Sequence, residues 1–170
     1  MVSLIIAATL NQLGHAYAGS YDFVLYTSYD WSDKTEDTCD TTCSSGYKTT
    51  GNVTMTHHAR FTYSYDLPGW TDVSKQSKKV QQQWARLLAV ITAHEMGHKQ
   101  TTEAIVAAFD GETEGFLVIA CQEVYKNERQ KALDAQDADF SGRLTAAHED
   151  AQSAYHMRVG SVIYADVFFW

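Results

Sequence analysis

Residues 80–108 read VQQQWARLLAVITAHEMGHKQTTEAIVAA and carry the clearest periodic pattern in the chain. Its apolar residues recur three and four positions apart, which is the period of a helix with one face turned towards a core. The apolar positions are Val80, Trp84, Leu87, Leu88, Ile91, Ile105 and Ala108. We expect a helix that begins after the capping residues Asp72 and Ser74 and ends at Asp110-Gly111.

The pentapeptide His94-Glu95-Met96-Gly97-His98 lies inside this helix. Two histidines four residues apart project from the same helix face, about one turn apart, and can hold one metal ion together. Glu95 lies at the edge of that face, where it can reach a water molecule on the metal. Polar side chains on a core-facing stripe are costly to bury unless something pairs them, and a metal ion does so. The pattern therefore predicts a metal site.

A catalytic zinc ion commonly takes three protein ligands and one water molecule, so a third ligand is needed. Our first candidate is His156, because a long second helix can fold back and bring it to the first. His148 lies eight residues earlier and falls on roughly the same face. The remaining candidates are Glu123 and Glu128.

The chain changes character near its only proline, Pro68. Before it, 21–31 is rich in aromatic and β-branched residues, and 52–65 alternates between apolar and polar residues. Both patterns predict strands, joined by a polar loop that carries two cysteines. His57 and His58 are adjacent in the second strand, so they face opposite ways and we expect both at the sheet surface.

After the first helix we expect a second helical region that begins near Glu112, breaks near Phe140-Ser-Gly142 and continues through Ala146–Met157. Its apolar residues are Phe116, Val118, Ile119, Val124 and Leu133. The apolar tail Val159–Trp170 is expected to return as a strand or to pack on the helices. The predicted fold class is α+β: one domain over 1–170, with a small antiparallel sheet packed against long helices.

The chain has 170 residues and a formal charge of -8, which argues against non-specific binding to nucleic acid or to anionic membranes. No apolar run has the length of a membrane span, so we expect no integral membrane segment. Residues 1–18 fit two interpretations, a signal peptide with Ala16-x-Ala18 before its cleavage site or a short amphipathic helix.

The three cysteines are Cys39, Cys43 and Cys121. A zinc site on the two neighbouring cysteines would need two more ligands, and the segment around them offers only aspartates. A disulfide is the better interpretation, either Cys39–Cys43 or one of these with Cys121.

The order of short elements along the chain resembles a known family. These elements are the cysteine loop, the alternating strand, Leu67-Pro68-x-Trp70, Trp84, His94-Glu95-x-Gly97-His98, Cys121 and Tyr155-x-x-Arg158. Over about 21–162 the chain is similar to the bacterial family of predicted secreted zinc-dependent proteases, long catalogued as a domain of unknown function. The resemblance implies a zincin-like, secreted or periplasmic metallopeptidase, with His94 and His98 as ligands and Glu95 as the catalytic residue. It also supports pairing Cys121 with Cys39 or Cys43.

One departure concerns the third ligand. The family tends to end in Tyr-Asp-x-x-Thr-x-His-Gly, whereas this chain has His156 at the aspartate position and Ser161 at the histidine position. His156 is therefore expected to replace the late histidine as the ligand.

The expected function is zinc-dependent hydrolysis of peptide bonds in a protein or peptide substrate, with Glu95 as general base. Arg158 or Tyr155, next to His156, is expected to stabilise the oxyanion. Two alternatives stay open: a zinc amidase acting on cell-wall or modified peptides, and an inactive binding module stabilised by a metal. A fourth protein ligand would indicate a structural metal, and an open position would indicate catalysis.

Overall fold

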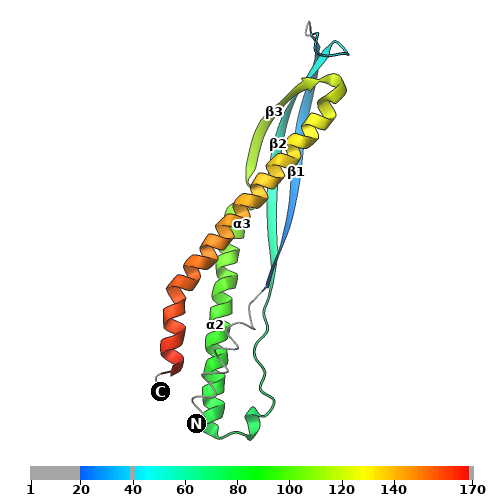
Figure 1. Cartoon of the computed structure of the whole chain (residues 1–170). Helices are drawn as coiled ribbons and strands as arrows, with labels where there is room; N and C mark the ends of the chain where they lie inside the picture. Colours follow the sequence, from blue (N-terminus) through cyan, green and yellow to red (C-terminus); the bar gives the residue numbers. More distant parts are fainter. Residues whose placement is uncertain (1–19, 39–40, 169–170) are drawn as a thin grey trace. The chain divides into compact units, whose positions relative to one another are not determined.

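The structure is a computed structural model that describes residues 20–38 and 41–168, and it confirms the α+β class (Figure 1). The expectations for residues 1–18, for Cys39 and for the last two residues lie outside the described part. Along the chain the elements are β1 (Ser20–Asp37), β2 (Tyr47–Ser64), the short 3-10 helix η1 (Val73–Lys75), α2 (Lys78–Phe109), β3 (Thr113–Cys121) and α3 (Gln122–Phe168).

Three strands form one sheet in the order β1-β2-β3. Strands β2 and β3 pair antiparallel, with a register that runs from Lys48↔Cys121 to Thr56↔Thr113. Hydroxyl pairs link β1 to β2 at both ends, Ser20 with Ser64 at 2.8 Å and Thr35 with Thr49 at 2.9 Å. The two predicted strands are confirmed, and both are longer than the sequence pattern indicated.

The prediction of helix after Glu112 is wrong for 113–121, which forms β3. Gly111 has a φ of +83°, which ends α2 and turns the chain. The backbone N–H of Gly111 then donates to the carbonyl of His57, and the N–H of His57 donates to the carbonyl of Glu112. These two bonds start the ladder with β2. Phe116, Val118 and Ala120 consequently alternate towards the core, whereas Leu117 and Ile119 are 60% and 63% exposed.

Helix α2 begins later than its predicted caps because Ser77 is the residue that caps it. The Ser77 hydroxyl accepts from the backbone N–H of Val80 at 3.4 Å, the usual contact of an N-cap with the third helical residue. The predicted end at Asp110-Gly111 is confirmed.

Helix α3 has no break at Gly142, contrary to the prediction. A helical glycine costs about 1 kcal/mol relative to alanine. Burial of Phe140 and Leu144, which are 2% and 1% exposed, is worth more than that and holds this part of the helix in place. The tail up to Phe168 belongs to the same helix, so of the two expected alternatives the return as a strand does not occur there.

The chain divides into two compact units. The second unit, Phe23–Arg60 with Ile105–Ala147, has a core of five buried residues: Val53, Met55, Val118, Tyr125 and Leu133. The first unit takes in residues up to Asp22, Phe61–Ala104 and the chain from His148 onwards. Its aromatic contacts include Tyr21 with Tyr63 and Trp70 with Trp84, at ring distances of 5.0 and 5.5 Å.

A disulfide joins Cys43 to Cys121 in the second unit. This confirms the pairing with Cys121 that the family resemblance supports. The bond ties the loop between β1 and β2 to the end of β3, across 78 residues of sequence.

Among the described residues, no helix combines the length and the apolar character that crossing a membrane would require.

Candidate metal centre

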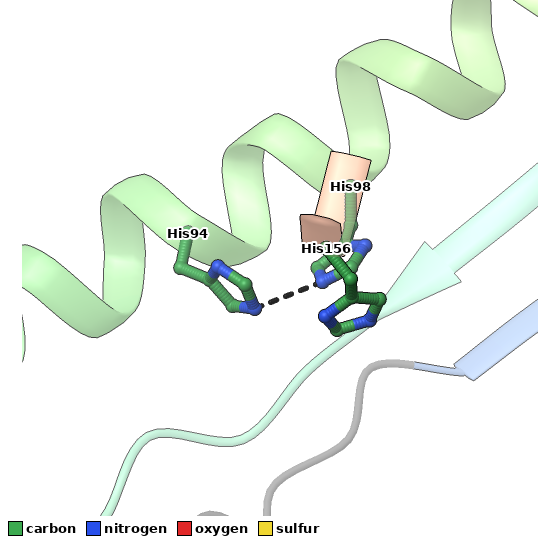
Figure 2. A group of neighbouring side chains, drawn as sticks. All are labelled: His94, His98 and His156. Carbon is green, nitrogen blue, oxygen red and sulfur yellow. Dashed lines mark hydrogen bonds between the residues drawn. The ribbon is translucent and has the colours of Figure 1, made fainter. Parts of the chain in front are cut away.

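Three histidines of the first unit converge on one point (Figure 2). Helix α2 supplies His94 and His98, which its 3.6-residue period places on one face, and α3 supplies His156. One ligand-competent atom from each histidine lies within 4.8 Å of the others. His98 is buried, His94 is half-buried and His156 is exposed, so the group opens to solvent on the α3 side.

The two α2 histidines face each other through their Nε2 atoms, which are 2.9 Å apart. A contact this short needs a proton or a cation between the two lone pairs. His94 Nδ1 is buried and has no hydrogen-bond partner among the described residues. In a tetrahedral zinc site with Zn–N bonds of about 2.0–2.1 Å, two ligand nitrogens lie about 3.3 Å apart. A small side-chain adjustment would therefore admit the ion, and the residues fit a metal.

Electrostatics favour the ligand-competent form of His94. Burial, the adjacent His98 and the nearby His156 lower the pKa of His94 below its usual value, although Glu95 opposes them in part. Its imidazole is neutral at neutral pH, and neutral imidazole is the form that binds metals.

Glu95 is held by a tyrosine from the sheet. It is 5% exposed, and its Oε2 accepts a hydrogen bond from the Tyr63 hydroxyl at 2.5 Å. Burial and the adjacent carboxylate raise the pKa of Tyr63 well above its usual value, so the phenol keeps its proton and stays a donor. One carboxylate oxygen is therefore fixed, which limits the orientations of the other.

Tyr155 packs against α2 at Gly97. Its hydroxyl donates to the backbone carbonyl of His94 at 2.9 Å, and a Cβ on Gly97 would overlap the phenol ring. The glycine of the pentapeptide thus makes room for a ring from α3. Arg158, the other predicted oxyanion donor, is exposed and lies with its guanidinium 5.8 Å from the centre of the Tyr155 ring.

Two residues that the sequence analysis did not assign to the site, Thr102 and Gln152, lie around His98. His148, a candidate ligand, joins them through hydrogen bonds rather than through the metal group. Gln152 contacts His98 Nδ1 through Oε1 at 2.5 Å. Its Nε2 donates to the Thr102 hydroxyl at 2.9 Å, and His148 Nε2 lies 3.0 Å from the same hydroxyl. The sequence spacing could have indicated Thr102 and Gln152, because residues 94, 98 and 102 and residues 148, 152 and 156 each repeat every four positions.

The structure places the other candidate ligands elsewhere. His148 is buried, contacts the Thr102 hydroxyl and does not belong to the converging group. Glu123 and Glu128 lie in the second unit, where Glu128 pairs with Lys131 at 2.8 Å. Glu123 accepts from the hydroxyls of Ser45 and Ser44, and these bonds lower the pKa of its carboxyl to about 2.

His57 is not at the sheet surface as expected, because its side chain is 1% exposed. It stacks on Phe140 with a ring distance of 4.3 Å, and its Nε2 lies 2.9 Å from a carboxylate oxygen of Glu114. His58 faces the other way and stacks on Tyr26, which confirms that the two histidines point in opposite directions.

The sequence model of one family matches residues 6–160 and carries the description "Bacterial protein of unknown function (DUF922)". The chain belongs to this family. No curated protein and no solved structure matches it. The resemblance to a bacterial family of unknown function is thereby confirmed, whereas the description of DUF922 names no activity or metal.

Proposed function

We propose that this protein is a metal-dependent peptidase that holds zinc with His94, His98 and His156 and uses Glu95 as its general base. The observation that carries the proposal is the convergence of three imidazoles beside a buried carboxylate. Nitrogen ligands of this type and number match catalytic zinc sites. Among the side chains that the structure describes, in 20–38 and 41–159, no fourth histidine, cysteine or carboxylate joins the group, which leaves a coordination position for water.

When bound, zinc supplies a Lewis acid that activates a water molecule and polarises the carbonyl of the peptide bond. Glu95 takes one proton from the water, whose oxygen bonds to the carbonyl carbon, and then delivers that proton to the nitrogen as the C–N bond breaks. The Tyr63 hydroxyl donates a hydrogen bond to Oε2 of Glu95, so we assign proton transfer to the other carboxylate oxygen. We assign stabilisation of the developing negative charge to Arg158, since the hydroxyl of Tyr155 is already bonded to the His94 carbonyl.

The disulfide supports a compartment in which such bonds persist. Disulfides are stable in secreted and periplasmic proteins and rare in the reducing cytosol. We therefore place the proposed activity outside the cytoplasm, on a protein or peptide substrate.

The test compares Glu95→Gln with Glu103→Gln, an exposed glutamate on the same helix that pairs with Lys99. Metal content is measured by mass spectrometry after dialysis, and hydrolysis is measured with casein and with cell-wall muropeptides. We expect one zinc ion per chain in all proteins and a loss of hydrolysis of at least about 100-fold in Glu95→Gln alone. Full activity in Glu95→Gln, or a wild-type protein without zinc, would refute the proposal. Cleavage of muropeptides but not casein would move the assignment to an amidase.

The ligand set is tested separately with His156→Ala and with Met157→Ala, a neighbouring side chain that is 78% exposed. His156→Ala should lower the zinc affinity by orders of magnitude, whereas Met157→Ala should leave it unchanged. Equal affinities in the two variants would remove His156 from the ligand set.

A further inference from the structure

Gln152, on α3, makes three polar contacts with α2, the helix that carries His94 and His98. Its side chain touches His98 twice, at the ring and at the backbone carbonyl, and also touches Thr102. We propose that Gln152 is a positioning residue that selects the tautomer of His98 and so determines which nitrogen is free to bind the metal. The role in metal binding rests on the proposed function, but the choice of tautomer does not.

The orientation of the Gln152 amide follows from its partners. Its Nε2 lies 3.2 Å from the backbone carbonyl oxygen of His98, an atom that can only accept a hydrogen bond. Rotating the amide by 180° would bring its oxygen against this carbonyl with no hydrogen between them. The same Nε2 donates to the hydroxyl oxygen of Thr102 at 2.9 Å. The NH₂ end is therefore fixed towards the backbone of α2.

With the nitrogen fixed, the amide oxygen faces the ring of His98. Oε1 lies 2.5 Å from Nδ1, and an amide oxygen can only accept, so Nδ1 must carry a proton. A neutral imidazole has one such proton, which leaves a lone pair on Nε2. Nε2 is the atom of His98 that faces His94 Nε2 at 2.9 Å, on the side where the three histidines converge.

The surroundings keep water from disturbing this arrangement. His98 is 7% exposed and Thr102 is fully buried. The hydroxyl of Thr102 lies 3.1 Å from the His98 carbonyl and 3.0 Å from His148 Nε2, so every partner of the Gln152 amide is itself engaged. A second polar residue that orients a metal-binding histidine in this way commonly contributes about 10–100-fold to metal affinity.

The test uses Gln152→Leu, which removes the acceptor. Gln130→Leu is the matched control, since Gln130 lies on the same helix in an exposed contact with Asp134. The first readout is the nitrogen-15 spectrum of the His98 ring in the metal-free protein. The second is zinc affinity, measured by competition with a chelator.

We expect a proton on Nδ1 and none on Nε2 of His98 in the wild type and in Gln130→Leu. In Gln152→Leu the ring should shift towards the other tautomer, and zinc affinity should fall by about 10–100-fold. A wild type whose His98 carries its proton on Nε2, or an unchanged tautomer in Gln152→Leu, would overturn the proposal. A wild type that binds no zinc would refute the proposed function, while the metal-free spectra would still decide the role of Gln152.

Discussion

Replacing Gly97 by alanine tests how closely the predicted metal site depends on the packing of α3. In an exposed helix the change would stabilise the protein by about 1 kcal/mol, because glycine is the poorer helix former. At Gly97 the added Cβ would overlap the ring of Tyr155, which is 8% exposed and has little room to move.

The structure decides which effect is larger. Overpacking a buried contact costs about 1–3 kcal/mol, and moving the Tyr155 ring away also breaks its bond to the His94 carbonyl, worth about 1 kcal/mol. After subtracting the helix-propensity gain, we expect Gly97→Ala to lower the free energy of unfolding by about 2 kcal/mol. For a chain of this size, that corresponds to a fall in Tm of about 4–8 °C.

Gly142 provides the matched control, because it also lies inside a helix but a Cβ there meets nothing within 4 Å. Gly142→Ala should therefore raise the free energy of unfolding by about 0.5–1 kcal/mol. Both variants are measured by urea unfolding followed by circular dichroism, with zinc affinity measured in parallel. Zinc affinity should fall only in Gly97→Ala, since the displaced Tyr155 adjoins His156. Two changes of the same sign in unfolding free energy would show that Tyr155 does not occupy the space beside Gly97.

Two further outcomes concern the buried histidines. His57→Gln should lower the free energy of unfolding by about 2–3 kcal/mol, because it removes the partner of the Glu114 carboxylate. His58→Gln, on the opposite face of β2, should change the free energy of unfolding by less than about 1 kcal/mol, and urea unfolding compares the two variants directly. Burial and the nearby His98 lower the pKa of His148 below its unfolded value of 6.5, although Glu149 opposes them. The neutral side chain therefore contributes its full share of the folding stability above pH 6.5, and this share is lost as the pH falls below 6.5. Unfolding free energies between pH 7 and pH 5 should therefore decline less steeply in His148→Gln than in the wild type, and parallel curves would contradict this.

The sequence predicted those elements in which the apolar residues follow a single period, either that of a strand or that of a helix. The alternation in 52–65 and the helical repeat in 80–108 correspond to β2 and α2, because each places one continuous face in a core. The prediction of helix for 113–121 is wrong because a short apolar run fits the period of a helix and that of a strand equally well. Its conformation is decided by hydrogen bonds to β2, about sixty residues earlier in the chain, which no local pattern reveals.

Local reasoning also failed at Gly142 and at His57, for a related reason. A glycine predicts a break only if nothing holds the helix, and Phe140 and Leu144 hold it by burial. His57 looked like a surface residue because its partner Glu114 lies on β3, the strand that was not predicted. Both errors concern tertiary contacts, whereas the convergence of His94, His98 and His156 followed from helix periodicity together with a fold-back of α3.

The pairing of α2 with α3 in the first unit gives both α2 ligands a hydrogen-bond partner from α3. Gln152 bonds the ring of His98, and Tyr155 bonds the backbone of His94 while filling the space that Gly97 leaves. Because these contacts involve only protein atoms, folding restricts the α2 histidines before any ion arrives. We therefore expect the conformational cost of ordering the site to fall on folding rather than on metal binding, which favours affinity. The same coupling explains why variants at Gly97 and Gln152, neither of which is a ligand, should change zinc affinity.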